Sequence, residues 1–302
     1  MIAIWERPQV VVTVEWLSRE NMNDIRVTSS GSTVRVDFSP GGSKRSKYVR
    51  FKIDVPQDIN LDLRTGSGEI EVVGNLTGGL RVHTSNGDIT MDDVTGKVDV
   101  STSSGDIRTG RISGTGYLKT SGGDIRVEDA AAELDVRTSG GNIKIGNVGK
   151  WLDANTSGGN ILVGDVGGEA RLSTAGGNIE VGRVRGGATI NTAGGMVRLM
   201  SASGEVTANT AGGDIELYDI TGAVDARTAG GDIFAEIMPK GVRRSSLVNA
   251  GSDIRLNIDP RAKGTIEARI RVDREYIRRA GSKNKGIFFR LRNPLVVQGG
   301  LL

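Results

Sequence analysis

A short phrase recurs along this chain at a fixed interval. It reads Thr-Ser-Gly-Gly-Asp-Ile from Thr120, and close copies, with Asn for Asp or Ala for Ser, begin at Thr138, Thr156, Thr174, Thr210 and Thr228. Looser copies begin at Thr65, Thr84, Thr102 and Thr192. The eight steps that follow Thr84 are equal in length, and the step from Thr65 to Thr84 is one residue longer. A fixed period, here about 18 residues, indicates a repeat architecture in which each unit packs on its neighbours.

Apolar residues keep fixed positions within each unit. With the threonine as position zero, they fall at +5, +7, +10, +14 and +16. In the unit that begins at Thr138 they are Ile143, Ile145, Val148, Leu152 and Ala154. The pairs +5/+7 and +14/+16 alternate with polar residues, which is the period of a β-strand. The array is therefore predicted to be all-β, with a strand after the Gly-Gly, a corner near +10 and a longer strand that ends at the next threonine.

One unit of this size cannot bury its own apolar face, so the units must stack. Each strand then pairs in parallel with its copy about 4.8 Å away, and the inward side chains form one continuous core. The sequence predicts a single-chain parallel β-solenoid (β-helix) of roughly ten coils, about 50 Å long at this spacing. The Gly-Gly at +2 and +3 is expected to make a sharp turn, where glycine adopts positive φ without steric cost.

Stacking also aligns polar residues into columns. Inward threonines are expected to pass a hydroxyl hydrogen bond along their column, and the Asp or Asn at +4 forms a second column in which neutral Asn separates like charges. The residues assigned to this turn and ladder role are Thr120, Gly122, Gly123, Asp124, Thr138, Gly140, Gly141, Asn142, Thr156, Gly158, Gly159 and Asn160. Outward side chains at +6 mix both signs of charge, which is typical of a solvated wall.

The composition narrows the chemistry that the chain can perform. The absence of Cys excludes disulfides, thiol catalysis and Cys-ligated metals. The single His, His83, stands in an outward slot before Thr84 and is assigned a structural or neutral role. No Ser is expected to have a His partner, which argues against a Ser-His-Asp triad. We expect no cofactor, no metal, no catalytic residue and no enzymatic activity.

Two acidic patterns have both a functional and a structural explanation. Gly-Gly-Asp suggests calcium by analogy to nonapeptide β-roll repeats, but those need a nine-residue period and more oxygen ligands per turn. The pair Asp92-Asp93 could serve as an acid and base on acidic sugars. It stands in turn positions, however, and a smooth-walled solenoid offers no cleft that would hold two carboxylates at a defined separation. A structural turn is favoured in both cases.

The chain divides into three parts. Residues 1–60 lie outside the repeat and are predicted to form an N-terminal β cap, followed by the solenoid array at 61–258 and a basic C-terminal cap or extension at 259–302. Strands are expected in the first part at Val10–Trp16, Asp24–Thr28, Thr33–Asp37 and Tyr48–Val55. A degraded copy of the repeat begins at Asn249, three positions later than the period from Thr228 would place it. A further strand is expected at Ile266–Val272, and Tyr276, Phe288 and Phe289 are candidates to plug the end of the core.

The net charge of +3 hides an uneven distribution. Residues 61–239 carry 15 Lys/Arg against 24 Asp/Glu, or −9, whereas residues 240–292 carry 15 against 5, or +10. The basic segment could engage a polyanion such as a surface polysaccharide. It lacks interleaved aromatics, so no specific nucleic acid is expected. A solvated cap and self-association with an acidic neighbour are the alternatives. The candidate contact residues are Arg269, Arg271, Arg274, Arg278, Arg279, Lys283 and Lys285.

The N-terminal segment and the first repeat carry a resemblance to a known family. The order Trp5-Glu-Arg-Pro-Gln-Val-Val-Val, Asp24-Ile-Arg-Val and Tyr48-Val-Arg-Phe-Lys-Ile-Asp-Val-Pro leads into Leu61-Asp-Leu-Arg-Thr-Gly-Ser-Gly-Glu-Ile. This resembles the DUF4097 type of bacterial β-solenoid domain, over about residues 1–258. The resemblance implies a β-helical envelope or secreted protein with an adhesin-like role, and it carries over no catalytic residue.

The leading hypothesis is a non-enzymatic structural or adhesin-like solenoid at the cell surface or secreted, with head-to-tail or edge-to-edge self-association into filaments. The alternatives are a polysaccharide-binding or polysaccharide-cleaving β-helix and a cytoplasmic scaffold polymer. No run of residues reaches the roughly 18 apolar residues of a membrane helix. A signal peptide pattern is missing from the N-terminus, and both termini resemble interrupted β-structure, so a processed or excerpted chain is expected.

Overall fold

The computed structural model of the chain describes residues 1–7, 9–15, 24–38, 50–238, 244–260 and 262, together with the backbone of strands at 266–270, 288–290 and 297–301. Within these residues the structure is built from β-strands and contains no α-helix. The all-β prediction is therefore confirmed.

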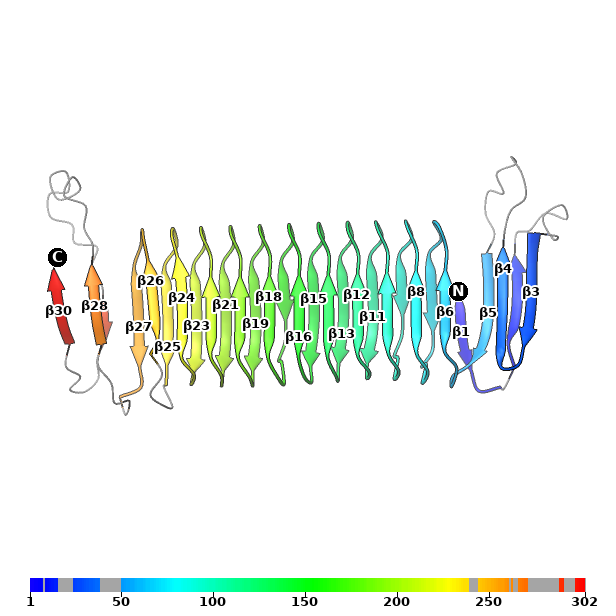
Figure 1. Cartoon of the computed structure of the whole chain (residues 1–302), viewed down its shortest axis with the longest axis horizontal. Helices are drawn as coiled ribbons and strands as arrows, with labels where there is room; N and C mark the ends of the chain where they lie inside the picture. Colours follow the sequence, from blue (N-terminus) through cyan, green and yellow to red (C-terminus); the bar gives the residue numbers. More distant parts are fainter. Residues whose placement is uncertain are drawn as a thin grey trace.

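Two sheets of stacked strands face each other along the length of the array (Figure 1). The larger sheet has fifteen strands, in the order β2 (Val11–Glu15), β5 (Arg50–Pro56), β1 (Ile2–Trp5), β7 (Ile70–Val73), β9 (Ile89–Met91), β11 (Ile107–Ile112), β13 (Ile125–Ala130), β15 (Ile143–Val148), β17 (Ile161–Val163), β19 (Ile179–Val184), β21 (Val197–Ala202), β23 (Ile215–Ile220), β25 (Ile233–Ile237), β27 (Ile254–Ile258) and β29 (Phe288–Arg290). The smaller sheet has eleven, in the order β26 (Ser246–Asn249), β24 (Val224–Thr228), β22 (Val206–Asn209), β20 (Ala188–Asn191), β18 (Ala170–Ser173), β16 (Leu152–Asn155), β14 (Leu134–Arg137), β12 (Gly116–Lys119), β10 (Val98–Ser101), β8 (Leu80–His83) and β6 (Leu61–Arg64).

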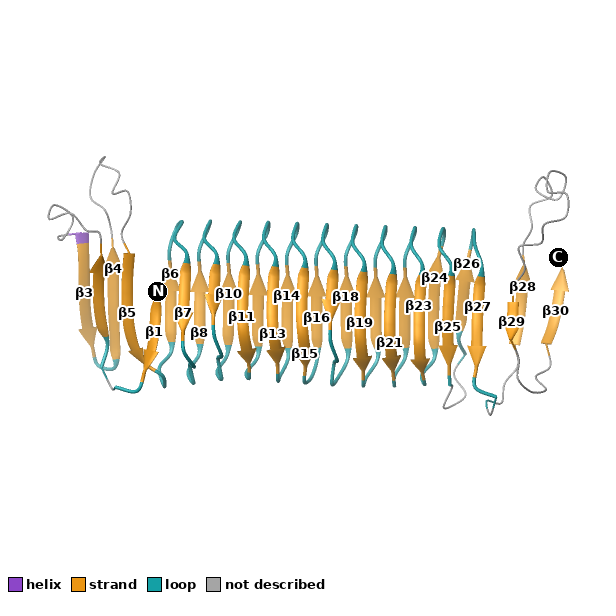
Figure 2. Ribbon diagram, turned by 180° about the vertical axis from the view of Figure 1, so that it is seen from behind, coloured by secondary structure: helices purple, strands orange, loops and turns teal. Residues whose placement is uncertain are grey.

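Strands one repeat apart pair in parallel and in register. Ile143 of β15 pairs with Ile125 and Ile161 in the coils on either side, and Leu152 of β16 pairs with Leu134 and Ala170. Each repeat contributes one strand to each sheet, and the turns run in two rows along the edges (Figure 2). The predicted parallel β-solenoid is confirmed, with eleven strands in the smaller sheet where roughly ten coils were expected.

The predicted order of strand lengths, with the longer strand before the next threonine, holds for β9 and β10 and for β17 and β18, but it is wrong for most other coils. In the unit that begins at Thr138, the strand after the Gly-Gly is the longer one, with six residues in β15 against four in β16. The reason is that Gly146 and Asn147 both lie outward between the buried Ile145 and Val148. Two consecutive outward residues let β15 continue to +10 before the chain turns, so the corner follows +10.

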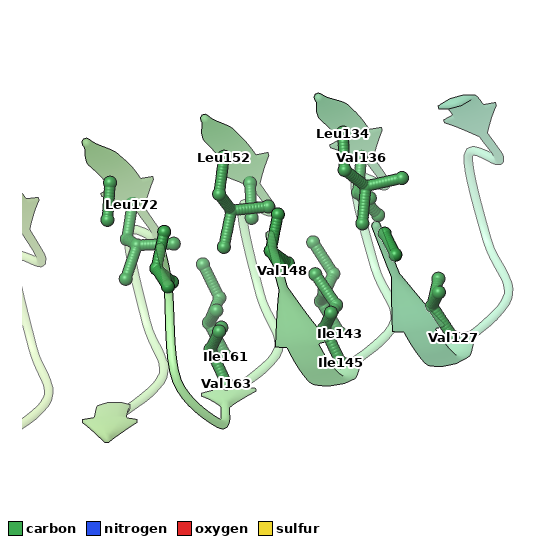
Figure 3. Packing of buried hydrophobic residues seen from close by; sticks show 14 of the residues in the cluster. Val127, Leu134, Val136, Ile143, Ile145, Val148, Leu152, Ile161, Val163 and Leu172 are labelled. Atoms are coloured by element: carbon green, nitrogen blue, oxygen red, sulfur yellow. The ribbon is translucent and has the colours of Figure 1, made fainter. Parts of the chain in front are cut away.

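The inward side chains fill the space between the two sheets. Figure 3 shows Leu134, Leu152 and Leu172 of the smaller sheet pointing toward the layer that contains Ile143 and Ile161. Each of these five side chains is at most 1% exposed. Burying a side chain of this size contributes about 1.5–3 kcal/mol, and the coils repeat that contribution along the array.

The N-terminal segment extends the larger sheet past the first coil. Strand β1 lies between β7 and β5, and β2 pairs antiparallel with β5. Strands β3 (Ile25–Ser30) and β4 (Thr33–Phe38) form an antiparallel hairpin. The ring of Phe38 meets that of Phe51 edge-on at 5.8 Å, which joins the hairpin to β5. The four strands expected before residue 60 are present with shifted ends; Trp16 and Tyr48 lie outside the described residues.

The degraded copy at the C-terminal end continues the stack. Asn249 pairs with Thr228, and Ile254 pairs with Ile233, despite the three extra residues before them. Strand β29 adds to β27, and β28 (Ile266–Ile270) pairs with β30 (Val297–Leu301). The strand expected from Ile266 is thus present. Tyr276 and the side chains of Phe288 and Phe289, the candidate plug, lie outside what the structure describes.

Candidate functional site

The repeated threonines form a buried hydrogen-bonded ladder that runs through glycine. The Thr138 hydroxyl donates to the Gly123 carbonyl in the preceding coil at 2.9 Å and accepts from the Gly141 N–H of its own coil at 3.3 Å. The threonines from Thr84 to Thr228 repeat both contacts, with donor distances of 2.8–3.2 Å. The expected Thr-to-Thr relay is therefore replaced by a Thr-to-Gly relay that fastens each turn to the turn before it.

Asn249 takes the place of threonine in the degraded copy. Its Nδ2 donates to the Gly231 carbonyl of the preceding coil at 2.7 Å, and its Oδ1 accepts from the Gly251 and Ser252 N–H groups at 2.9 and 3.0 Å. The amide has both a donor and an acceptor, as the hydroxyl does. The ladder thus continues through the last copy of the repeat.

The glycines of the turn are required by close approach and not by positive φ, which corrects the sequence-based explanation. Among the described glycines, positive φ occurs at Gly31 and Gly74, both outside the Gly-Gly pairs. A Cβ on Gly123 would overlap the Gly105 carbonyl, and one on Gly141 would overlap the Gly123 carbonyl. The first glycine of each pair has more room, since the atom nearest to a Cβ on Gly122 is 3.7 Å away.

The Asp and Asn at +4 form a column that binds backbone amides. The Asp124 Oδ1 accepts from the Asn142 N–H at 2.6 Å, and the Asn142 Oδ1 accepts from the Asn160 N–H at 2.9 Å. The same contact recurs from Asp88 to Asn178 and again from Asp214 to Asp253. Both residue types accept through Oδ1, which is why they are interchangeable at this position.

The carboxylates of the acidic pair Asp92-Asp93 also accept hydrogen bonds from backbone N–H groups of neighbouring coils. The Asp92 Oδ2 accepts from the Gly74 N–H at 2.8 Å, and the Asp93 Oδ1 accepts from the Arg111 N–H at 2.7 Å. Asp129 and Asp165 repeat the second contact further along the column. These hydrogen bonds account for one oxygen of each carboxylate in the pair and place both residues in the backbone ladder.

His83 has a serine neighbour, contrary to the expectation that no Ser would have a His partner. Its Nδ1 lies 2.9 Å from the Ser101 Oγ of the next coil. Both side chains project from the outer wall of the smaller sheet, because His83 pairs with Ser101 in register. No hydrogen bond from the His83 ring to a carboxylate is present among the described residues, so the pair lacks the third group that orients a triad base.

Exposed ion pairs lie on the outer faces of both sheets. Arg137 contacts Asp135 on its own strand at 2.8 Å and Asp153 on the next strand at 3.6 Å. The Arg183 backbone N–H and guanidinium lower the pKa of Asp165. Those two side chains are 73% and 45% exposed, and exposed pairs of this kind stabilise a fold by at most about 1 kcal/mol.

The seven candidate polyanion contacts lie in the part of the chain whose side chains the structure does not describe. Arg269 belongs to β28, whose backbone alone is described. The other six, Arg271, Arg274, Arg278, Arg279, Lys283 and Lys285, lie outside the described residues.

The sequence reasoning missed a cluster on the outer wall of the larger sheet. The Tyr218 and Phe234 rings lie 5.1 Å apart at 46°, beside the half-exposed Met200. The Tyr218 hydroxyl donates to the Glu216 Oε2 at 3.2 Å, and the Arg198 Nε donates to the same oxygen at 2.8 Å. Desolvation raises the pKa of Tyr218, and the charge of Glu216 raises it further. The sequence could have indicated this cluster, since Met200, Tyr218 and Phe234 occupy outward positions of the repeat that hold polar residues or glycine in most other coils.

A comparison of the sequence with known protein families gives a match that covers the N-terminal half of the stack. The family described as Toastrack DUF4097 matches residues 9–167, from just before β2 to just past β17. The chain belongs to the Toastrack family. No curated protein and no solved structure gives a significant match.

The described part of the Toastrack chain contains neither a metal-binding cluster nor a membrane-spanning helix. No group of three or more His, Asp or Glu side chains there is arranged to hold a metal ion. A helix with the length and apolar character needed to cross a membrane is likewise not found in those residues.

We expect Thr138→Val to lower the free energy of unfolding by roughly 2 kcal/mol, because it leaves the buried Gly123 carbonyl and Gly141 N–H without their partner. Thr138→Ser keeps the hydroxyl and should cost about 0.8 kcal/mol, the value of one buried methyl group. Denaturant unfolding of both variants measures the difference. Equal stability of the Val variant and the wild type would show that the ladder contributes nothing net.

Proposed function

We propose that this protein is a non-enzymatic structural rod of the cell exterior, which adheres through its surface and associates end to end. The observation that carries the proposal is the uninterrupted stack from β6 to β27, in which Thr-Gly and Asp/Asn ladders fasten successive coils. Such a body holds its ends at a fixed separation. The hydrogen bonds of Asp92 and Asp93 to backbone amides support a structural role over an acid-base role on polysaccharide.

End-to-end association is supported by the two edges of the smaller sheet. Within the described residues, β6 pairs on one side with β8, and β26 pairs on one side with β24. Every pairing between them is parallel, so β26 of one copy placed beside β6 of the next would continue the sheet without a change of direction. Open edges of this kind are templates for strand addition.

Asp62→Pro tests this association. The Leu61 and Thr65 N–H groups donate to carbonyls on the β8 side, so strand alternation turns the Asp62 N–H toward the open edge. Proline at that position removes an edge donor and leaves the β6–β8 ladder intact. We expect the wild type to sediment as a concentration-dependent series of rods and Asp62→Pro to shift toward single rods, with Asp62→Asn behaving as the wild type.

Electron microscopy of negatively stained samples would show the same change in rod length. Association of Asp62→Pro at wild-type strength would contradict assembly through β6. Cell fractionation with surface proteolysis tests the location separately, and exclusive recovery from the cytoplasm would contradict the exterior role.

A further inference from the structure

The cluster at Tyr218 lies where the array departs from its own geometry. Two residues of β23, Tyr218 and Asp219, oppose the single residue Glu236 of β25. Asp219 has φ of 47°, the sole positive φ of a non-glycine residue in the described parts of the chain. The Ser201 hydroxyl lies 3.3 Å from the Asp219 carbonyl oxygen. Bulges and left-handed residues cost energy and concentrate at functional positions.

The surface around the cluster is strongly acidic. We define the Tyr218 face as the outward side chains of residues 196–202, 214–220 and 232–237, which follow one another in the stack. It carries five carboxylates and one cation, for a net charge of −4. The charged residues are Asp214, Glu216, Asp219, Asp232, Glu236 and Arg198.

The rings and the carboxylates favour the same kind of partner. Tyrosine and phenylalanine faces attract ammonium and guanidinium groups, and the apolar stems of Lys and Arg pack on such rings and on Met200. Exposed carboxylates around the rings add long-range attraction for a basic partner. The Tyr218 face therefore has the chemistry to hold Lys and Arg side chains.

We propose that the Tyr218 face binds residues 271–287 of a second copy of this chain. That segment carries six Lys/Arg against two Asp/Glu, a net charge of +4 that complements the face. The face lies on β21, β23 and β25, and the segment follows β28 in the chain, so both belong to the C-terminal half. Two copies exchange the contact reciprocally, which makes a closed two-fold dimer. The contact is separate from the sheet edges at the ends of the rod.

The test uses the full chain in the Asp62→Pro background, so that end-to-end contacts do not obscure the result. Sedimentation velocity at low salt is expected to show a dimer that dissociates as salt is raised. Tyr218→Ala with Phe234→Ala should weaken dimerisation at least about tenfold, because both ring faces are lost. Tyr218→Phe, which keeps the ring, and Leu162→Ala, which removes an exposed side chain elsewhere on this wall, should dimerise as the wild type does.

Mixing two defective variants tests the reciprocal exchange. One variant lacks the Tyr218 and Phe234 rings, and the other has the six Lys/Arg of residues 271–287 replaced by Gln. Each should be monomeric by itself, and the mixture should form a heterodimer held by one intact contact. Wild-type dimerisation of the ring variant, or of the Gln variant, would overturn the proposal. An Asp62→Pro chain with no other change that stays monomeric at low salt at every concentration would also overturn it.

Discussion

Gly123→Ala is expected to open the Toastrack array at that coil and to lower the free energy of unfolding by roughly 3 kcal/mol. The added Cβ would overlap the carbonyl oxygen and carbon of Gly105. Both are backbone atoms, so neither can rotate away, and the two coils must separate. The separation would lengthen the contact from the Thr120 hydroxyl to the Gly105 carbonyl, which joins these two coils. Denaturant unfolding measures the loss, and hydrogen exchange locates it.

Gly122→Ala is the matched control, one residue away in the same turn. Its Cβ would stand 3.7 Å from the Ser104 Cα, an ordinary van der Waals contact. Since Gly122 has no positive φ, alanine adopts its conformation without strain and also reduces the entropy of the unfolded chain. We expect a change within about 0.5 kcal/mol of the wild type. Equal destabilisation by both substitutions would refute close approach as the reason for the second glycine.

The stacking of the coils and the register of strand pairing could be predicted because the apolar residues recur at one fixed interval along the sequence. Ile125, Ile143 and Ile161 stand one repeat apart, and a core between two sheets forms when they pair in parallel. A register shifted by one residue would turn these side chains toward solvent. The same argument placed Asn249 and Ile254 in the stack despite their late arrival.

Details of the turns could not be predicted from residue type. Glycine permits both positive φ and close backbone approach, and the sequence of Gly122-Gly123 does not distinguish the two. The structure distinguishes them, since the Gly123 Cα lies so close to the Gly105 carbonyl that a Cβ would overlap it. The hydrogen bonds that Asp93, Asp129 and Asp165 accept from backbone N–H groups could have been predicted from the sequence, because these residues all stand nine positions after a repeat threonine.

The Tyr218 face could not be predicted in full from the sequence, for a different reason. The repeat places Met200 and Tyr218 at outward positions in successive coils, which the sequence alone indicates. The register shift between β23 and β25 is not periodic, however, and it begins at Tyr218, whose ring lies 5.1 Å from the Phe234 ring. Departures from a repeat are therefore where sequence-based prediction of a solenoid is least informative.

Leu134→Ala is expected to cause the largest loss of stability among the single substitutions considered, about 4 kcal/mol. Leu134 is 0% exposed, and its Cδ1 lies 2.7 Å from the position that a Cβ on Gly116 would take. The leucine thus fills space that glycine leaves in the preceding coil. Its truncation opens a cavity that spans two coils, which fixed strands on both sides cannot close.

A double-mutant cycle with Gly116→Ala tests this account. In the wild type, the added methyl group meets Leu134 Cδ1 and should cost about 1 kcal/mol, because a flexible side chain can shift only partly in a packed core. In the Leu134→Ala background the overlapping atom is gone, and the same methyl group fills part of the cavity. The double variant should therefore be more stable than the sum of the single changes predicts, by about 1 kcal/mol or more. Additive losses in denaturant unfolding would mean that Leu134 does not occupy the space above Gly116, and that the volume of each coil is set by that coil alone.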